Sequence, residues 1–204
     1  MFPDLTRDDV FRIETRRLWL RWPTAKDIPA IVTLAGDRAV AEVTAHIPHP
    51  LERRDVDAFL IKVRGANSAG AGLTLALARR EAPGSLIGLI GIAGDEAAPH
   101  LGYWLGRPWW GNGLMSEAAA GLIHAFFAYT SGERLTVGAL PENRASQRVI
   151  AKAGFRWTER RATPSPARGG ARDLDWFALE RAEWAEWAGR RTVAEGVPNL
   201  ALAS

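Results

Sequence analysis

HLGYWLGRPWWGNGLMSEAAAG, residues 100–121, joins a strand-like apolar run to a helix through a glycine turn. Residues 101–105 are mostly apolar or aromatic, which favours a buried strand. Gly111 and Gly113 follow, and glycine allows the backbone to turn sharply and to approach a ligand closely. From residue 114 to 130 apolar side chains recur at helical spacing. The stretch therefore predicts a strand, a turn and a helix N-terminus in that order.

The N-terminus of this predicted helix is a candidate site for a phosphate or pyrophosphate group, because its first N–H groups lie at the positive end of the helix dipole. Gly106 and Gly111 have the GxxxxG spacing of a P-loop. Asn112 and Gly113 then occupy the positions where that motif needs Lys and Ser or Thr, so the NTPase class is excluded. The dinucleotide fingerprint GxGxxG also fails, because Ser116 stands at its third glycine. A turn that needs two glycines for geometry alone is the structural alternative.

Length and composition indicate an ordinary globular domain. The chain has 204 residues, 47% of them apolar and 24% charged, which is enough for one substantial core. It contains no cysteine, so a disulfide, a thiolate nucleophile and a cysteine metal site are all excluded. The four histidines, at positions 46, 49, 100 and 124, form no HExxH-type pattern. No metal site is expected.

Charge and hydropathy limit the partners and the location. The net charge is only +3, and the arginines are scattered, so direct nucleic-acid binding is not expected. Residues 1–11 carry acidic side chains and no apolar core, unlike a signal peptide. No apolar run reaches the length of a membrane span. The sequence predicts a cytoplasmic protein with no membrane partner.

Local patterns predict the elements on either side of the central stretch. We expect strands at 16–22, 73–79, 85–93, 135–140, 155–161 and 173–179, and helices after Thr24, around 56–63, from after Asn143 to Ala153 and at 180–190. Residues 82–84 predict a hairpin turn, residues 39–50 a loop, and residues 162–172 a mobile connection. The order is that of an α/β protein with many hairpins around a mixed sheet. One domain is expected over 1–190, followed by a flexible tail over 191–204.

Three stretches resemble the GCN5-related N-acetyltransferase (GNAT) superfamily, and most closely its RimJ/RimL-type branch. They are ETRRLWLRWPTAKD at 14–27, LGYWLGRPWWGNGLMSEA at 101–118 and ENRASQRVIAKAGF at 142–155. They occur in the expected order, and the resemblance covers most of the chain. One departure concerns the superfamily pattern Gln/Arg-x-x-Gly-x-Gly/Ala, which has Trp110 at its first position and Met115 at its last.

The resemblance implies a fold and an activity. The fold is a mixed, mostly antiparallel sheet of about seven strands flanked by about four helices. The activity is transfer of an acetyl group from acetyl-CoA to a primary amine, by direct attack in a ternary complex and without a metal. A protein or peptide N-terminus, such as that of a ribosomal protein, is favoured over a small amine. A catalytically inactive CoA-binding sensor is the alternative, and the protein is expected to be a monomer or a homodimer. Whether acyl groups other than acetyl are used stays open.

The resemblance also implies roles for named residues. Backbone N–H groups around the glycine turn would bind the pyrophosphate of CoA, and they belong to Trp110, Gly111, Asn112, Gly113, Leu114, Met115 and Ser116. The backbone of Tyr103, Trp104 and Leu105 would pair with the pantetheine arm, and Asn143 would hydrogen-bond it. Ser146 would be the general acid for the CoA thiolate. The structural alternative makes Asn143 a helix cap and Ser146 a solvated helix residue.

The general base that accepts the proton of the amine is not identified by the sequence. The candidates are Glu42, His46, Glu96, His100 and a water molecule. A terminal amine has a pKa of about 7.7–8.0, so a sizeable fraction is already neutral and a water relay is sufficient.

Overall fold

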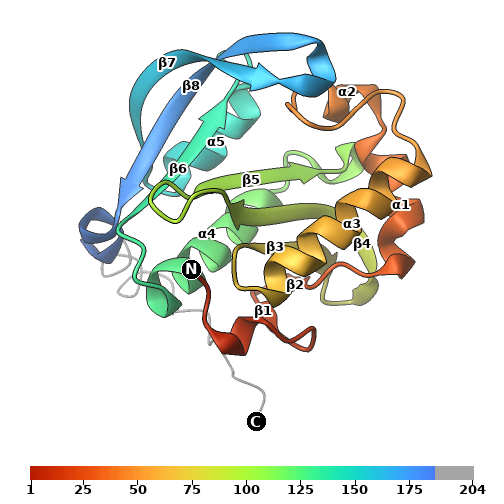
Figure 1. The fold of residues 1–204 in the computed structure, drawn as a ribbon, viewed down its shortest axis with the longest axis horizontal. Coiled ribbons are helices and arrows are strands. Elements are labelled where there is room, and N and C mark those ends of the chain that lie inside the picture. Colours follow the sequence, from red (N-terminus) through yellow and green to blue (C-terminus); the bar gives the residue numbers. More distant parts are fainter. Residues whose placement is uncertain (187–204) are drawn as a thin grey trace.

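The computed structural model describes residues 1–186, and within them the strands form a single mixed sheet (Figure 1). The strand order is β1-β2-β3-β4-β5-β6-β8-β7. The strands are β1 (Arg12–Glu14), β2 (Leu18–Arg21), β3 (Leu73–Arg79), β4 (Ala82–Ala93), β5 (His100–Leu105), β6 (Arg134–Ala139), β7 (Arg156–Ser165) and β8 (Gly170–Glu180). Every neighbouring pair is antiparallel except β5 and β6, which are parallel. This mixed, mostly antiparallel α/β architecture confirms the predicted fold class.

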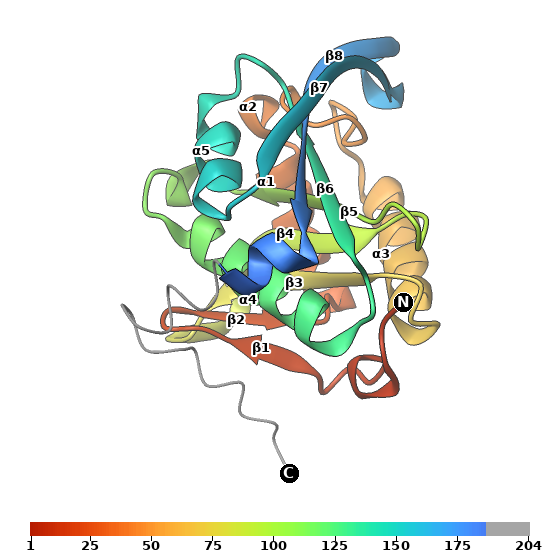
Figure 2. The same ribbon diagram turned by 90° about the vertical axis from the view of Figure 1, so that its left-hand side faces the viewer.

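Helices cover both faces of the sheet. They are α1 (Ile28–Ala35), α2 (Arg38–Ala41), α3 (Arg53–Ser68), α4 (Leu114–Tyr129) and α5 (Arg144–Lys152), and residues 181–186 are also helical. In the side view of Figure 2, α3 and α5 lie on opposite sides of the strands. Buried residues accordingly form two clusters, one between the sheet and α1 and α3, and a larger one between the sheet and α4 and α5.

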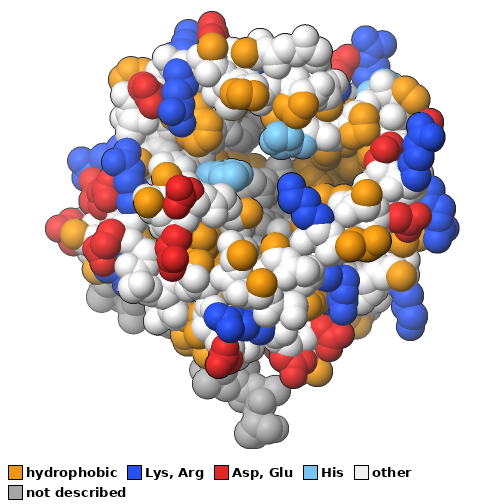
Figure 3. Space-filling view, in the orientation of Figure 1, with side chains coloured by type: hydrophobic (Ala, Val, Ile, Leu, Met, Phe, Trp, Pro, Cys, Tyr) orange, Lys and Arg blue, Asp and Glu red, His pale blue; other side chains and the backbone are white. Residues whose placement is uncertain are grey.

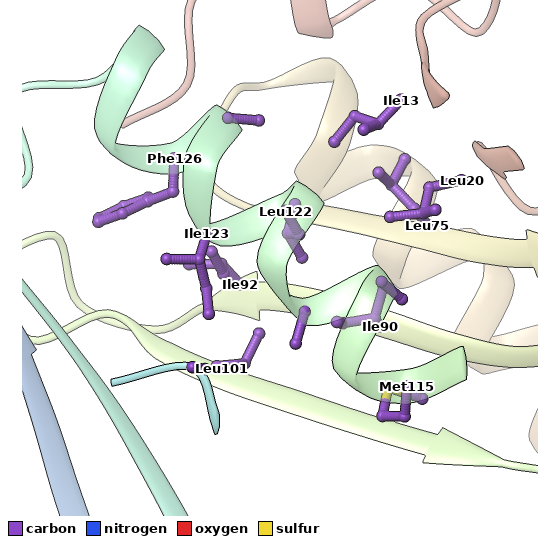
Figure 4. Packing of buried hydrophobic residues seen from close by; sticks show 14 of the residues in the cluster. Ile13, Leu20, Leu75, Ile90, Ile92, Leu101, Met115, Leu122, Ile123 and Phe126 are labelled. Atoms are coloured by element: carbon purple, nitrogen blue, oxygen red, sulfur yellow. The ribbon is translucent and has the colours of Figure 1, made fainter. Parts of the chain in front are cut away.

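Helix α4 is the centre of the larger core (Figure 4). Leu122, Ile123 and Phe126 on its inner side are fully buried and pack with the strand residues Ile90 and Ile92. Burying one such side chain contributes about 1.5–3 kcal/mol, so this packing holds the helix firmly on the sheet. The helix N-terminus, where it follows the glycine turn, is therefore positioned by the core rather than by the loop.

Strands β5 and β6 touch at one end only. Their single register pair is His100 with Thr136, although each strand has six residues. On their other sides, β5 pairs with β4 over six residues and β6 pairs with β8 over six. The two strands therefore diverge beyond His100 and leave part of the β5 edge without a strand partner.

Several predicted elements differ from the structure in extent. An eighth strand, β1, pairs with β2, and α2 overlaps the first three residues of the segment predicted as a loop. Residues 82–84 belong to β4 rather than to a turn, so the hairpin turns just before them. Short antiparallel strands and one-turn helices give weak periodic signals, which is why the sequence did not show them.

The largest difference is the segment 162–172, which was predicted to be a mobile connection. In the structure β7 continues through it to Ser165, a short 3-10 turn follows, and β8 starts at Gly170. Arg168 in this turn donates to the carbonyl oxygens of Ala41 and Ile47, and the latter bond is 2.7 Å long. These long-range bonds order a segment whose composition alone suggests a loop.

Two negative findings concern residues 1–186. No helix in this part of the chain is long and apolar enough to cross a bilayer, and no group of three or more His, Asp or Glu side chains is arranged to hold a metal ion. The predicted boundary at residue 190, Trp187 in the predicted last helix and the tail over 191–204 lie outside the described residues.

Candidate active site

The free edge of β5 is the first part of the site. Gly106 N–H donates to Ile87 O at 2.9 Å, and backbone groups alternate in direction along an antiparallel strand. The N–H and C=O of Tyr103 and Leu105 therefore point toward β6, whereas those of Trp104 point toward β4. Because β6 has already diverged, the Tyr103 N–H and C=O and the Leu105 N–H have no partner within residues 1–186. Of the three residues predicted to pair with a ligand, Tyr103 and Leu105 present free backbone groups.

Trp110 hydrogen-bonds to the last residue of the free β5 edge. The indole Nε1 of Trp110 donates to the carbonyl oxygen of Leu105 at 2.6 Å, so that acceptor is already used. The backbone N–H of Trp110 donates to Arg107 O at 3.1 Å, within the 3-10 turn Arg107–Trp109 and its cap. Trp110 therefore contributes no free backbone donor, and its role is to join the strand end to the glycine turn.

The glycine turn is the second part of the site. Gly111 and Gly113 have φ of 78° and 71°, in the left-handed region that favours glycine, and Gly113 is the N-cap of α4. The backbone N–H groups of residues 111–116 donate to no acceptor in the described part of the chain. Six donors thus gather at the positive end of a 16-residue helix, which is a favourable place for an anion.

The side chains of Leu114 and Met115 point away from this anion site. Both are buried in the larger core, with 5% and 7% of their surface exposed, and Figure 4 shows Met115 there. Only their backbone N–H groups remain available to a ligand. A bulky methionine is therefore accommodated at position 115, where the superfamily pattern has glycine or alanine.

Helix α5 brings a polar pair to the free edge of β5. Asn143 is its N-cap, and its Oδ1 accepts the Ser146 N–H at 3.0 Å, as the structural alternative predicted. The Nδ2 of Asn143 has no acceptor within the described residues, so this group remains free. Ser146 Oγ lies 2.9 Å from the hydroxyl of Tyr103, 43 residues earlier in the chain. Burial raises the pKa of Tyr103 to about 12, although the hydrogen bond with Ser146 acts in the other direction.

The site combines an edge strand, a turn with unpaired backbone N–H groups and a hydroxyl pair, and comparison with known domains identifies the family of the chain. The model of the acetyltransferase (GNAT) domain matches residues 17–156. The chain belongs to the GNAT acetyltransferase family. The resemblance predicted from the three stretches is confirmed.

Three proteins similar to this GNAT chain are 17–29% identical to it. YkkB, an uncharacterized protein of Bacillus subtilis, is 29% identical over 97 residues, which span 46% of this chain and 56% of the relative. RimJ of Mycobacterium smegmatis, solved in complex with a CoA disulfide, superposes with a TM-score of 0.75 at 21% identity and covers 91% of this chain and 93% of its own. The ribosomal-protein-S5-alanine acetyltransferase of Vibrio fischeri has a TM-score of 0.73 at 17% identity, with 85% and 98% covered. The TM-scores of the two solved structures show a shared fold.

The candidate bases of this acetyltransferase are separated by the structure. Glu42 pairs with Arg38 at 2.6 Å on the surface, and this hydrogen-bonded pair lowers the pKa of Glu42. Glu96 pairs with the N-terminal amine of Met1 at 3.1 Å. Both carboxylates are thus engaged by a cation. Glu42 and Glu96 are therefore weaker candidates for the general base than an unpaired group.

The two candidate histidines, His46 and His100, lie close enough for the charge of one to affect the other. His100 shares one face of β5 with Gly102 and Trp104, opposite Tyr103, because side chains alternate along a strand. The protein around its ring desolvates it and lowers the pKa of His100, and the charge of His46 acts in the same direction. A Cβ added to Gly102 would meet no atom within 4 Å, so this face is open above the strand. Figure 3 shows histidine side chains at the rim of a hollow in this face of the molecule.

Two contacts at this site are not indicated by the sequence. Only the backbone of Tyr103 was expected to take part, whereas its hydroxyl contacts Ser146. Arg17 and Glu117 carry no local signal, and their side chains join the residue before β2 to the first turn of α4. The alternation of the strand could have indicated on which face the Tyr103 ring lies, but a contact between distant residues requires the tertiary structure.

Proposed function

We propose that this acetyltransferase uses acetyl-CoA as donor and transfers the acetyl group to a primary amine by direct attack in a ternary complex. The proposal rests on the order in which free hydrogen-bond donors and acceptors follow one another along the site. Free backbone groups of Tyr103 and Leu105 lead to the six unpaired N–H groups of residues 111–116. An amide-rich arm that ends in a pyrophosphate, as in CoA, matches them in that order. The binding of CoA by the structurally similar RimJ supports this assignment.

Each part of the ligand has a proposed contact. The pyrophosphate is bound by the N–H groups of residues 111–116, and the pantetheine amides pair with Tyr103 and Leu105 as an added strand. The free Nδ2 of Asn143 donates to a pantetheine carbonyl. The N–H of Tyr103 or Leu105 nearest the thioester polarises its carbonyl oxygen, and such donors stabilise the negative charge that develops there.

The leaving thiolate is stabilised by the hydroxyl pair. The amine nitrogen forms a bond with the carbonyl carbon, the C–S bond breaks, and sulfur leaves as a thiolate. The Tyr103 hydroxyl and Ser146 Oγ lie 2.9 Å apart and either can donate; with Tyr103 as the donor, the Ser146 proton is free to point at the sulfur. Because the pKa of Tyr103 is about 12 and that of a thiol about 8.5, full proton transfer from Tyr103 is uphill by about 5 kcal/mol. The pair therefore acts as a hydrogen-bond donor, and the thiolate finally takes its proton through solvent.

The amine loses its proton on the opposite face of β5. His100 stands on that face two residues from the open position at Gly102, about 7 Å along the strand. That distance suits a proton relay through water rather than direct contact. The lowered pKa keeps His100 neutral, and hence basic, near pH 7. We assign the base role to His100 acting through water.

The favoured acceptor is a protein or peptide N-terminus, and a small amine is the alternative. The similarity to the ribosomal-protein-S5-alanine acetyltransferase of Vibrio fischeri favours the first. A peptide panel and a panel of small amines, each incubated with acetyl-CoA and followed by thiol release, separate the two. Turnover of free small amines alone would contradict the preference for a chain terminus.

The donor and the chemistry are tested together. Acetyl-CoA should raise the melting temperature, because it binds the native state only. Ser146→Ala should keep CoA affinity and lower turnover, at most by the roughly 10²–10⁴-fold of a general acid–base group. The absence of both a thermal shift and thiol release at millimolar acetyl-CoA would refute the proposal. Binding without turnover on any amine would instead support the inactive CoA-binding module.

A further inference from the structure

Arg17 reaches the glycine turn from a segment 95 residues earlier in the chain than Asn112. Its residue lies just before β2, yet its Nη1 donates to Asn112 O at 3.0 Å. A Cβ built on Gly113 would lie 3.7 Å from Arg17 Nη2, which is the nearest atom to that position. The guanidinium therefore stands directly beside the N-cap of α4, where the free N–H groups gather.

Glu117 holds this guanidinium in place. Its Oε2 accepts Arg17 Nε at 2.6 Å, and its Oε1 accepts the Arg17 backbone N–H at 2.7 Å and the Thr15 hydroxyl at 2.6 Å. Burial alone would raise the pKa of Glu117, but the hydrogen bonds from Thr15 and Arg17 outweigh it and lower the pKa. Glu117 thus stays ionised. Arg17 is consequently a fixed donor rather than a mobile surface side chain.

The glycine turn itself supplies no free cation. Arg107 is the only charged residue among 106–116, and it pairs with Asp37 at 3.2 Å. The next charged residue along α4 is the acidic Glu117. Arg17 balances this carboxylate through Nε and holds the turn through Nη1, and its Nη2 has no acceptor within residues 1–186.

We propose that Arg17 is a phosphate-binding residue of the acetyl-CoA site, with Nη2 donating to the pyrophosphate and Nη1 positioning the turn that surrounds it. The inference rests on the proposed function. A guanidinium is suited to this task, because it is always charged and presents several donors in one plane. With Arg17 in place, the negative charge of Glu117 is neutralised next to a dianionic group. Without it, that carboxylate would repel the ligand.

The test compares Arg17→Ala with Arg16→Ala. Arg16 is the adjacent exposed arginine and makes no hydrogen bond or ion pair within the described residues, so it is a control of equal charge. Affinity is measured for CoA and for dephospho-CoA, which lacks the 3′-phosphate. Catalysis is measured with acetyl-CoA and with S-acetylpantetheine, which has no phosphate. Arg17→Lys keeps the positive charge but lacks the coplanar N–H donors of the guanidinium. It is included in case Arg17→Ala does not fold.

Arg17→Ala should weaken CoA and dephospho-CoA alike by about tenfold or more, the loss typical of a charge-assisted hydrogen bond. Its kcat/KM on S-acetylpantetheine should equal that of Arg16→Ala. Arg17→Lys should give an intermediate loss with the same pattern. Three results overturn the inference: unchanged CoA affinity, an equal loss on S-acetylpantetheine, or a loss confined to CoA, which would assign Arg17 to the 3′-phosphate. If the parent protein itself does not bind CoA, the proposed function fails, and not the role of Arg17 alone.

Discussion

Valine in place of Gly113 tests the anion site most directly, because a matched position exists elsewhere in the chain. Gly113 has φ of 71° and Gly169 has φ of 73°, so valine is equally strained at both. A Cβ meets no steric obstacle at either position: the nearest atom, Arg17 Nη2, is 3.7 Å away at Gly113, and none lies within 4 Å at Gly169. Gly169 lies in the turn between β7 and β8, away from the glycine turn.

The expected stability changes follow from the backbone alone. A left-handed conformation costs a residue with a Cβ about 1–2 kcal/mol. In a domain of this size, each kcal/mol lowers the melting temperature by about 2–4 °C, so both variants should melt roughly 2–8 °C lower than the parent. Differential scanning calorimetry without ligand measures this, and similar values for Gly113→Val and Gly169→Val are expected.

The two variants should differ in CoA binding. A valine side chain at position 113 would stand where the pyrophosphate approaches the N–H groups of α4. Losing two charge-assisted hydrogen bonds of about 1.5–3 kcal/mol each weakens binding by roughly 10²–10⁴-fold. Isothermal titration with CoA should show this loss in Gly113→Val and parental affinity in Gly169→Val. Equal affinity of the two variants for CoA would refute the assignment of the pyrophosphate to this turn.

Three further changes test the hydroxyl pair, the base and a buried ion pair. Tyr103→Phe should lower kcat by about 10–100-fold with little change in CoA affinity, because it removes the hydrogen-bond partner of Ser146 Oγ. Tyr129→Phe, at the other tyrosine of the chain, is the control and should leave kcat and CoA affinity unchanged. His100→Gln should lower kcat/KM and remove the acidic limb of its pH profile. In the parent this limb is shifted toward lower pH than for an ordinary histidine, because burial lowers the pKa of His100 and the neutral base persists to lower pH. Asp27→Asn should destabilise the fold by about 3 kcal/mol near pH 7, because Asp27 is buried and accepts two hydrogen bonds from Arg21, at 2.7 and 2.9 Å. Burial alone would raise the pKa of Asp27, but these bonds lower it below the unfolded value, so the contribution is present above the unfolded pKa and is lost as pH falls through the folded pKa.

Each of these three predictions would be contradicted by a specific result. Equal kcat values in Tyr103→Phe and Tyr129→Phe would exclude a role for the hydroxyl pair. An acidic limb that persists unchanged in His100→Gln would assign the base to another group or to water alone. For Asp27, chemical denaturation at pH 7 and at pH 3 should show a difference that shrinks on acidification, and a constant difference would mean that packing rather than charge is lost. Glu42→Gln on the exposed Arg38 pair is the control, and its effect should be small at both pH values.

Much of the fold could be predicted from the sequence because its signals are local. The helix from 114 follows from the spacing of its apolar residues, and the turn before it from glycines that take positive φ. Asn143 caps α5 through its own side chain, three residues from the N–H that it accepts. Alternation of Leu18 and Leu20 with Trp19 and Arg21 likewise predicts a half-buried strand, and β2 has the alternating burial expected. These features depend on a few neighbouring residues, so the amino-acid order determines them.

The tertiary structure decided which of these elements meet. The divergence of β5 and β6 depends on how two strands separated by α4 are held by β4 and β8, and no local pattern encodes it. Segment 162–172 is ordered by Arg168, which reaches carbonyl oxygens more than a hundred residues away. The contacts of Tyr103 with Ser146 and of Arg17 with Glu117 span 43 and 100 residues. Such pairs form only when the packed sheet brings distant segments together, so the sequence determined the parts of the site and the packing determined their chemistry.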